Sequence, residues 1–180
     1  MTHTLASLSR ACHELLAAGD TPAARRGVAE ALSCALKDPA FVREVFAQPI
    51  GERSVAWQDP QLGFCILAHE YREPREGKPH DHGPTWAIYG QADGESVMNE
   101  FAVVQPGRVR KLRSVTMRPG DARVYEQGEV HAVTHTGPSR LVRIEGRDLT
   151  TVKRGTYDVI GRASSAPSTT PRTGCRAAST

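Results

Sequence analysis

Apolar residues recur every three or four positions through the first 48 residues, which is the spacing that places them on one face of an α-helix. Two pairs, Thr21-Pro22 and Asp38-Pro39, are typical of helix starts, because the polar side chain caps the first turn and proline fits its first position. Gly19-Asp20 ends the first segment. The apolar faces of the three predicted helices lie within Leu5–Leu16, Val28–Leu36 and Phe41–Phe46.

From about Arg53 the pattern changes to the alternating or continuous apolar runs of β-strands, with turn residues between them. Short strands without intervening helices favour a double-sheet jelly roll, against which the three helices would lie. An immunoglobulin-like sandwich is the alternative, and strand number does not separate the two. The predicted strands are Ser54–Gln58, Gly63–Tyr71, Thr85–Ala92, Ser96–Val104, Val109–Met117, Ala122–Tyr125, Ala132–His135 and Ser139–Glu145.

Composition divides the 180 residues into a helical layer (1–50), a β-barrel of the same domain (51–161) and a tail (162–180). The tail holds no large apolar side chain, so we expect it to be disordered. It carries three arginines and no acid. Outside the tail the chain has 20 Lys and Arg residues, 23 minus these three, and the same number of Asp and Glu residues. A neutral body does not have the charge of a nucleic-acid-binding protein.

We expect neither a membrane span nor a secretion signal. No apolar stretch approaches the ~20 residues of a spanning helix, and no basic segment followed by an apolar run begins the chain. The four cysteines show no paired spacing, which is typical of a reduced protein. These features predict a cytoplasmic protein without membrane partners, either a monomer or a homodimer.

Two histidines separated by one residue, His80 and His82, stand just before the predicted strand Thr85–Ala92. In a strand, residues i and i+2 point to the same face, so both imidazoles would aim at one spot. Neutral imidazole is the commonest protein ligand for transition metals such as Fe, Cu, Zn and Ni. A third histidine, His131, follows later in the chain, and the three are candidate metal ligands.

The residues around these histidines resemble the two motifs of the cupin superfamily. Within the cupins, the chain resembles the cysteine dioxygenase group of thiol dioxygenases over about residues 5–148. The resemblance implies a mainly β cupin double-stranded β-helix with an N-terminal layer of short α-helices. The residues that carry it are Gly77, Pro79-His80-Asp81-His82, Ala87 and Gly94 in the first motif, and Pro119-Gly120, Tyr125, Glu129-Val130-His131 and His135-Thr136-Gly137-Pro138 in and after the second.

Family resemblance further implies Fe(II) held by His80, His82 and His131, with Ni or Zn possible in the purified protein. Three ligands on one face of a metal leave the opposite positions open for substrate and dioxygen. Most cupins add a carboxylate ligand at the position where Ala87 stands here. The protein ligands would therefore be neutral, and an anionic substrate, such as a thiolate or carboxylate, would balance the charge of the metal.

The chain departs from the cysteine dioxygenases at two places. Animal-type enzymes have a cysteine at the position of Ala87, cross-linked to a tyrosine, and that cross-link is impossible here. The Ser-x-His-x-Tyr relay of the family falls on Leu141, Arg143 and Glu145. These three share one strand face, and the resemblance directs that face into the barrel. Cysteine itself is therefore in doubt as the substrate.

Arg143 is a candidate to bind a substrate carboxylate through two parallel hydrogen bonds, with Glu145 orienting it or accepting a proton. A structural ion pair is the alternative. Tyr125 would either line the pocket or pack in the core. Arg53 stands one residue away from the family's carboxylate-binding arginine.

We therefore expect an enzyme, a non-heme Fe(II) dioxygenase that converts a small anionic thiol and dioxygen to a sulfinate. Its catalytic candidates are Arg143, Glu145 and Tyr125. One alternative is a metal-binding cupin that acts on a non-thiol carboxylic acid, and another is a non-catalytic sensor of a ligand or metal. The fold does not choose among them, because cupins host many chemistries.

Overall fold

A computed structural model describes residues 2–48 and 50–160 of the protein, and the predicted tail at 162–180 lies outside the described residues. Three helices precede ten strands. The helices are α1 (Leu5–Ala17), α2 (Pro22–Leu36) and α3 (Pro39–Val45). The strands are β1 (Ser54–Gln58), β2 (Cys65–Tyr71), β3 (Arg75–Glu76), β4 (Ala87–Asp93), β5 (Ser96–Gln105), β6 (Arg108–Met117), β7 (Ala122–Tyr125), β8 (Val130–His135), β9 (Ser139–Glu145) and β10 (Asp158–Val159).

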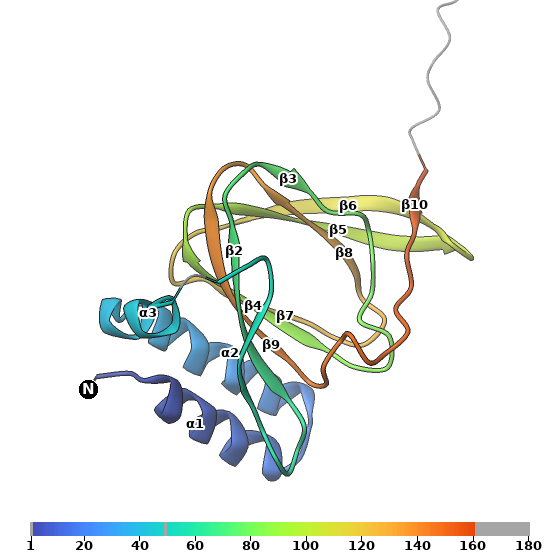
Figure 1. Ribbon diagram of the computed structural model, residues 1–180. Coiled ribbons are helices and arrows are strands. Elements are labelled where there is room, and N and C mark those ends of the chain that lie inside the picture. The colour runs from blue at the N-terminus through green and yellow to red at the C-terminus, as the bar shows by residue number, and fades with distance from the viewer. Residues whose placement is uncertain (1, 49, 161–180) are drawn as a thin grey trace, which may run out of the picture.

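The strands form two five-stranded sheets that face each other, in the orders β1-β2-β9-β4-β7 and β10-β6-β5-β8-β3 (Figure 1). Sequence neighbours such as β4 and β5 belong to different sheets, so the chain winds back and forth between the two layers. This is the double-stranded β-helix, or jelly roll, that the sequence predicts. The strand order therefore decides for the jelly roll and against the immunoglobulin-like sandwich.

The helix starts are those that the polar-proline pairs predict. The side chains of Thr21 and Asp38 accept hydrogen bonds from the backbone N–H groups of Ala24 and Ala40, at the first turns of α2 and α3. A capped first turn satisfies N–H groups that have no partner within the helix. The helices α2 and α3 are thus fixed at their N-terminal ends.

The helical layer covers the outer face of the sheet β1-β2-β9-β4-β7 (Figure 1). Alternate residues of β4 and β9 point in opposite directions, so Ile88 and Ile144 pack with the helices while Tyr89 and Leu141 pack inside the barrel. Gly90 allows the close approach of α2, because a Cβ atom there would lie 2.5 Å from Leu36 Cδ1 and 2.7 Å from Leu32 Cδ2. Two cores therefore share one sheet, and the inner one supports the candidate site.

No helix within residues 2–48 and 50–160 is both long and apolar enough to span a membrane.

Candidate metal centre

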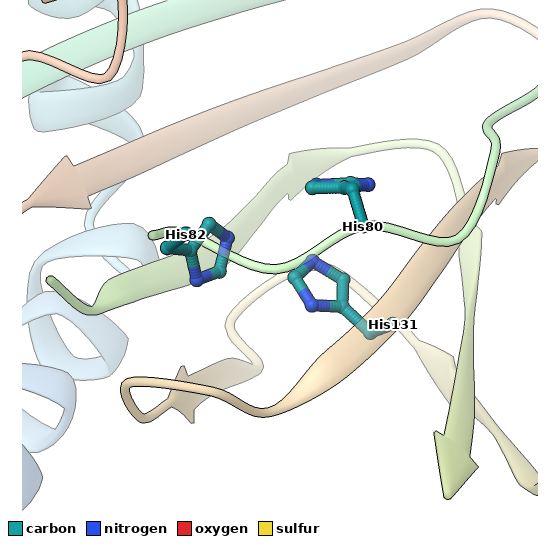
Figure 2. Close-up of side chains that lie close together, drawn as sticks. All are labelled: His80, His82 and His131. Atoms are coloured by element: carbon teal, nitrogen blue, oxygen red, sulfur yellow. The ribbon is translucent and has the colours of Figure 1, made fainter. Parts of the chain in front are cut away.

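Three histidines converge at one end of the barrel (Figure 2). His131 lies on β8, whereas His80 and His82 lie on the loop between β3 and β4. The prediction that His80 and His82 share the face of a strand was therefore wrong. His80 approaches His131 through a backbone pair, in which His80 N–H donates to His131 O at 2.9 Å and His131 N–H donates to His80 O at 3.0 Å.

One ring nitrogen from each histidine lies within 4.8 Å of the others. The His131 ring is central, with ring centroids 4.7 Å from His80 and 4.8 Å from His82. Imidazole–metal bonds of ~2.0–2.1 Å place two ligand nitrogens at most ~4.2 Å apart, so only small side-chain rotations separate this arrangement from a coordinating one.

Each of the three imidazoles also keeps a nitrogen free for a metal. His80 Nδ1–H donates to Lys78 O at 2.9 Å, which fixes the tautomer and leaves Nε2 with its lone pair. His82 Nδ1 and both ring nitrogens of His131 are buried without a hydrogen-bond partner among the described residues. Buried polar atoms without partners are costly, and coordination would satisfy them. The residues present therefore fit a three-histidine metal site.

All three histidines are neutral at neutral pH. Burial, together with the neighbouring His80 and Arg143, lowers the pKa of His82 to about 3. Burial and the two neighbouring imidazoles lower the pKa of His131 well below its ordinary value. Burial likewise lowers the pKa of His80. Because metals bind the neutral ring, no proton has to leave before coordination at neutral pH.

We expect the metal-free protein to lose stability as the pH falls from about 6.5 toward 4. Burial lowers the pKa of His69 and His82 to about 3 and that of His135 to about 4. These rings stay neutral in the folded protein while the unfolded chain, with histidine pKa values of ~6.5, takes up protons. The unfolded state then binds more protons, so the free energy of unfolding falls by about 1.4 kcal/mol per pH unit for each such ring.

Urea unfolding near pH 7 and near pH 5 measures this loss. The depressed carboxylate pKa values, such as those of Asp81 and Glu100, lie below the ordinary values of 3.8 for Asp and 4.5 for Glu. The stability that these carboxylates contribute is therefore lost mainly below the pH range of the two measurements, which leaves this window to the histidines. Equal unfolding free energies at the two pH values would contradict the neutral, buried state of these rings.

A pocket of about 680 Å³ opens beside His80. Glu52 is the one acidic side chain among the described residues that line it. Lys78 and Arg154 are exposed at the pocket and have no acidic partner within 4.0 Å among the described residues. The basic side chains of the lining are Arg53, Arg75, Lys78, Arg143 and Arg154. Such a lining attracts anions.

Arg143 lies in the pocket lining, and Glu145 lies behind it. The Arg143 side chain is 12% exposed and Glu145 is fully buried. Arg143 Nη2 donates to Glu145 Oε1, while Arg53 Nη2 lies 3.3 Å from Oε2 of the same carboxylate. The backbone N–H of Leu149 donates to Oε2 at 2.9 Å. Glu145 therefore orients two arginines, and it is not among the residues that line the pocket.

Tyr89 connects Arg143 to the three histidines. Its hydroxyl lies 3.3 Å from His82 Nε2 and 3.5 Å from Arg143 Nη1, and the Arg143 guanidinium lies 5.5 Å from the centre of its ring. Burial raises the pKa of Tyr89, so its hydroxyl is protonated at neutral pH. Tyr89 stands in the predicted strand Thr85–Ala92, and no spacing in the sequence relates it to His82 or Arg143.

Tyr125 packs against His131. Its ring stacks on the His131 ring with a centroid distance of 3.9 Å and an interplanar angle of 21°. Its hydroxyl lies 3.4 Å from Glu100 Oε1, and Tyr125 is not among the residues that line the pocket. The structure thus places Tyr125 in contact with a candidate ligand, and its catalytic role stays a prediction.

Two further residues, Arg53 and His69, line the pocket, and neither belongs to a clear sequence motif. Arg53 Nη2 donates to Asp148 Oδ1 at 2.6 Å, which holds the guanidinium beside Glu145. His69, on β2, lies in the lining with Nδ1 2.5 Å from Glu52 O and with Nε2 buried without a partner among the described residues. Alternate residues of a strand face the same side of the sheet, and this alternation along β2 is the one sequence feature that indicates an inward-facing His69.

No protein-family model and no curated protein matches the chain. Similar solved structures include a conserved protein with a double-stranded β-helix domain from Klebsiella pneumoniae, with 16% identity, coverage of 65% of this chain and 94% of that chain, and a TM-score of 0.45. KdgF from Halomonas sp. has 17% identity, coverage of 56% and 83%, and a TM-score of 0.45. A cupin superfamily protein from Desulfitobacterium hafniense has 14% identity, coverage of 53% and 76%, and a TM-score of 0.42.

These similarities are weak, and the fold assignment rests on the strand order itself. The narrower resemblance to cysteine dioxygenases stays a prediction.

Proposed function

We propose that the protein is a metal-dependent dioxygenase that converts a small anionic thiol to a sulfinate, with Fe(II) bound by His80, His82 and His131. The observation that carries the proposal is a cluster of three neutral imidazoles, of which His80 belongs to the basic lining of the pocket. A neutral ligand set leaves the charge of a divalent metal for the substrate to balance. The basic lining favours a substrate with a carboxylate in addition to the sulfur.

The proposed reaction needs no partner beyond dioxygen. A thiol and O₂ give a sulfinate and a proton: both oxygen atoms bond to sulfur, the S–H and O–O bonds break, sulfur loses four electrons and dioxygen gains them. When bound, Fe(II) would lower the pKa of the thiol and activate dioxygen in the open positions.

The protein's own residues would bind and orient the substrate. Arg143 offers its guanidinium to a carboxylate, because Glu145 occupies only Nη2 and Nε is buried without a partner among the described residues. The protonated Tyr89 hydroxyl, between Arg143 and His82, would donate a hydrogen bond to a ligand atom near the metal. Lys78 and Arg154 would draw anions toward the opening.

A non-thiol carboxylic acid is the second candidate substrate. The basic lining favours a substrate with a carboxylate whether or not that substrate also contains sulfur. The positions of the family's Ser-x-His-x-Tyr relay are occupied here by Leu141, Arg143 and Glu145, so no residue at these positions is specific to a thiol.

Oxygen uptake by the protein loaded anaerobically with Fe(II) tests the proposal. We expect 3-mercaptopropionate to consume one O₂ for each sulfinate formed. Cysteamine, which lacks the carboxylate, and 3-hydroxypropionate, which lacks the sulfur, are matched controls and should consume far less. Turnover of the hydroxy acid would favour the second candidate, and a loaded protein that consumes no oxygen with any small anionic thiol would contradict the proposal.

A further inference from the structure

The C-terminal strap, defined here as residues 153–159, crosses the loop that carries His80 and His82 (Figure 1). Tyr157 N–H donates to Pro79 O at 3.0 Å, and Asp81 N–H donates to Gly155 O at 3.2 Å. The far end of the strap is β10, which pairs in parallel with the start of β6. The strap therefore links the two-histidine loop to the barrel.

The carboxylate of Asp81 is the centre of this link. Oδ1 accepts hydrogen bonds from Gly83 N–H and Gly155 N–H, both at 2.8 Å. Oδ2 accepts a hydrogen bond from the Tyr157 hydroxyl at 2.6 Å. Asp81 stands between His80 and His82 in the chain, so one carboxylate ties both sides of the loop to the strap.

Two glycines make room for these contacts. A Cβ atom on Gly155 would lie 2.5 Å from Asp81 Oδ2 and 2.8 Å from the Tyr157 hydroxyl oxygen. Gly83 has a φ of 62°, a region that favours glycine, and a Cβ atom there would collide with the carbonyl oxygen of Lys153. The strap and loop are thus packed backbone against backbone.

His82 depends on this link more than His80 does. His80 is held directly by its backbone pair with His131 and by a second bridge to Thr156 of the strap. None of the backbone hydrogen bonds found within residues 2–48 and 50–160 involves His82, although its side chain is fully buried. The nearest fixed points on either side of His82 are the hydrogen bonds of Asp81 and Gly83.

We propose that Asp81 and Tyr157 are positioning residues of the metal centre, which hold the loop so that His82 faces His80 and His131. The proposal rests on the three-histidine metal site and is independent of the reaction. Residues that orient metal ligands through hydrogen bonds influence metal affinity without touching the metal. The same strap brings Arg154 and Thr156 to the wall of the pocket, so it connects metal binding with the anion site.

Titration with Co(II), followed through its visible absorption, tests this role in the full-length protein. Tyr157→Phe removes only the hydroxyl, and Asp81→Ala removes all three accepted hydrogen bonds. We expect Co(II) affinity to fall by about 10-fold in Tyr157→Phe and further in Asp81→Ala, with an altered absorption spectrum in both. Asp81→Asn keeps one oxygen acceptor and should recover part of the affinity.

Ser33→Ala is the matched control. The Ser33 hydroxyl donates to Gly120 O at 2.6 Å, a bond of the same length between α2 and a turn outside the metal site. This variant should change the melting temperature by an amount similar to Tyr157→Phe while Co(II) affinity and spectrum stay as in the wild type.

The outcomes separate the two claims. If the wild type binds no Co(II), the metal site itself is wrong. If the wild type binds Co(II) and both Tyr157→Phe and Asp81→Ala bind it with unchanged affinity and spectrum, the positioning role is overturned and the metal site stands.

The Asp81→Ala/Tyr157→Phe double variant should bind Co(II) no more weakly than Asp81→Ala, because both changes remove the same hydrogen bond. Independent, additive losses would also overturn the proposal.

Discussion

The His82→Ala variant should purify with almost no divalent metal while it keeps its fold. Two imidazoles remain, His80 and His131, and two ligands are too few to hold Fe(II) or a competing ion. The barrel has its own apolar core, which includes Met98 and Leu141, so loss of a ring on the loop should leave the sheets intact. Elemental analysis and circular dichroism of the purified variant measure the two effects.

His135→Ala is the matched control for this experiment. His135 is another buried histidine of β8, but it is not among the three converging residues, and Ser139 Oγ lies 2.8 Å from its Nδ1. It should retain the metal content of the wild type. Full metal occupancy in His82→Ala would contradict the three-histidine assignment, whatever the activity of the variant.

The Arg143→Leu variant should bind small carboxylates about 10- to 100-fold more weakly than the wild type. A hydrogen bond to a charged group contributes ~1.5–3 kcal/mol, which corresponds to this range. The metal content should not change, because within the part of the chain that the structure describes no hydrogen bond joins Arg143 to a histidine, and the Tyr89 hydroxyl lies between them. Arg143→Lys keeps the charge but loses the planar, two-pronged geometry, so it should recover only part of the affinity. Calorimetric titration with 3-mercaptopropionate under anaerobic conditions measures both variants.

The same substitution should also lower the free energy of unfolding. Glu145 is fully buried, and without Arg143 its side-chain partners among the described residues are Arg53 at 3.3 Å and the Leu149 N–H. Breaking a buried ion pair by removing one member leaves a charge that is poorly compensated. Arg143→Leu/Glu145→Leu removes both charges and should restore stability without restoring carboxylate binding. Unchanged carboxylate affinity in Arg143→Leu would contradict the anion-binding role of this residue.

Much of the fold could be predicted because its signals are local. The bounds of β1, β7 and β9 agree with prediction, since alternation and turn residues mark both ends of each strand. The two-residue strands β3 and β10 were missed, because two residues carry no periodicity. They are strands only because β8 and β6 provide partners from distant parts of the chain.

The site could be predicted only where its residues form a motif. The three histidines were identified from their spacing and the resemblance, but the reason given for the convergence of His80 and His82 was wrong. The approach of His80 to His131 depends on a backbone pair across 51 positions, from residue 80 to residue 131. Asp81 and Tyr157, which are 76 positions apart, meet only in the folded chain. No pattern within one segment carries that information.

X-ray absorption at the iron edge, recorded on the anaerobic Fe(II)-loaded protein before and after addition of 3-mercaptopropionate, tests the central claim most directly. The account predicts three imidazole ligands in the free enzyme, completed by light oxygen ligands, and one sulfur ligand after the thiol is added with the three imidazoles retained. A spectrum with fewer than three imidazoles, or one in which the thiol adds no sulfur to the iron, would contradict it.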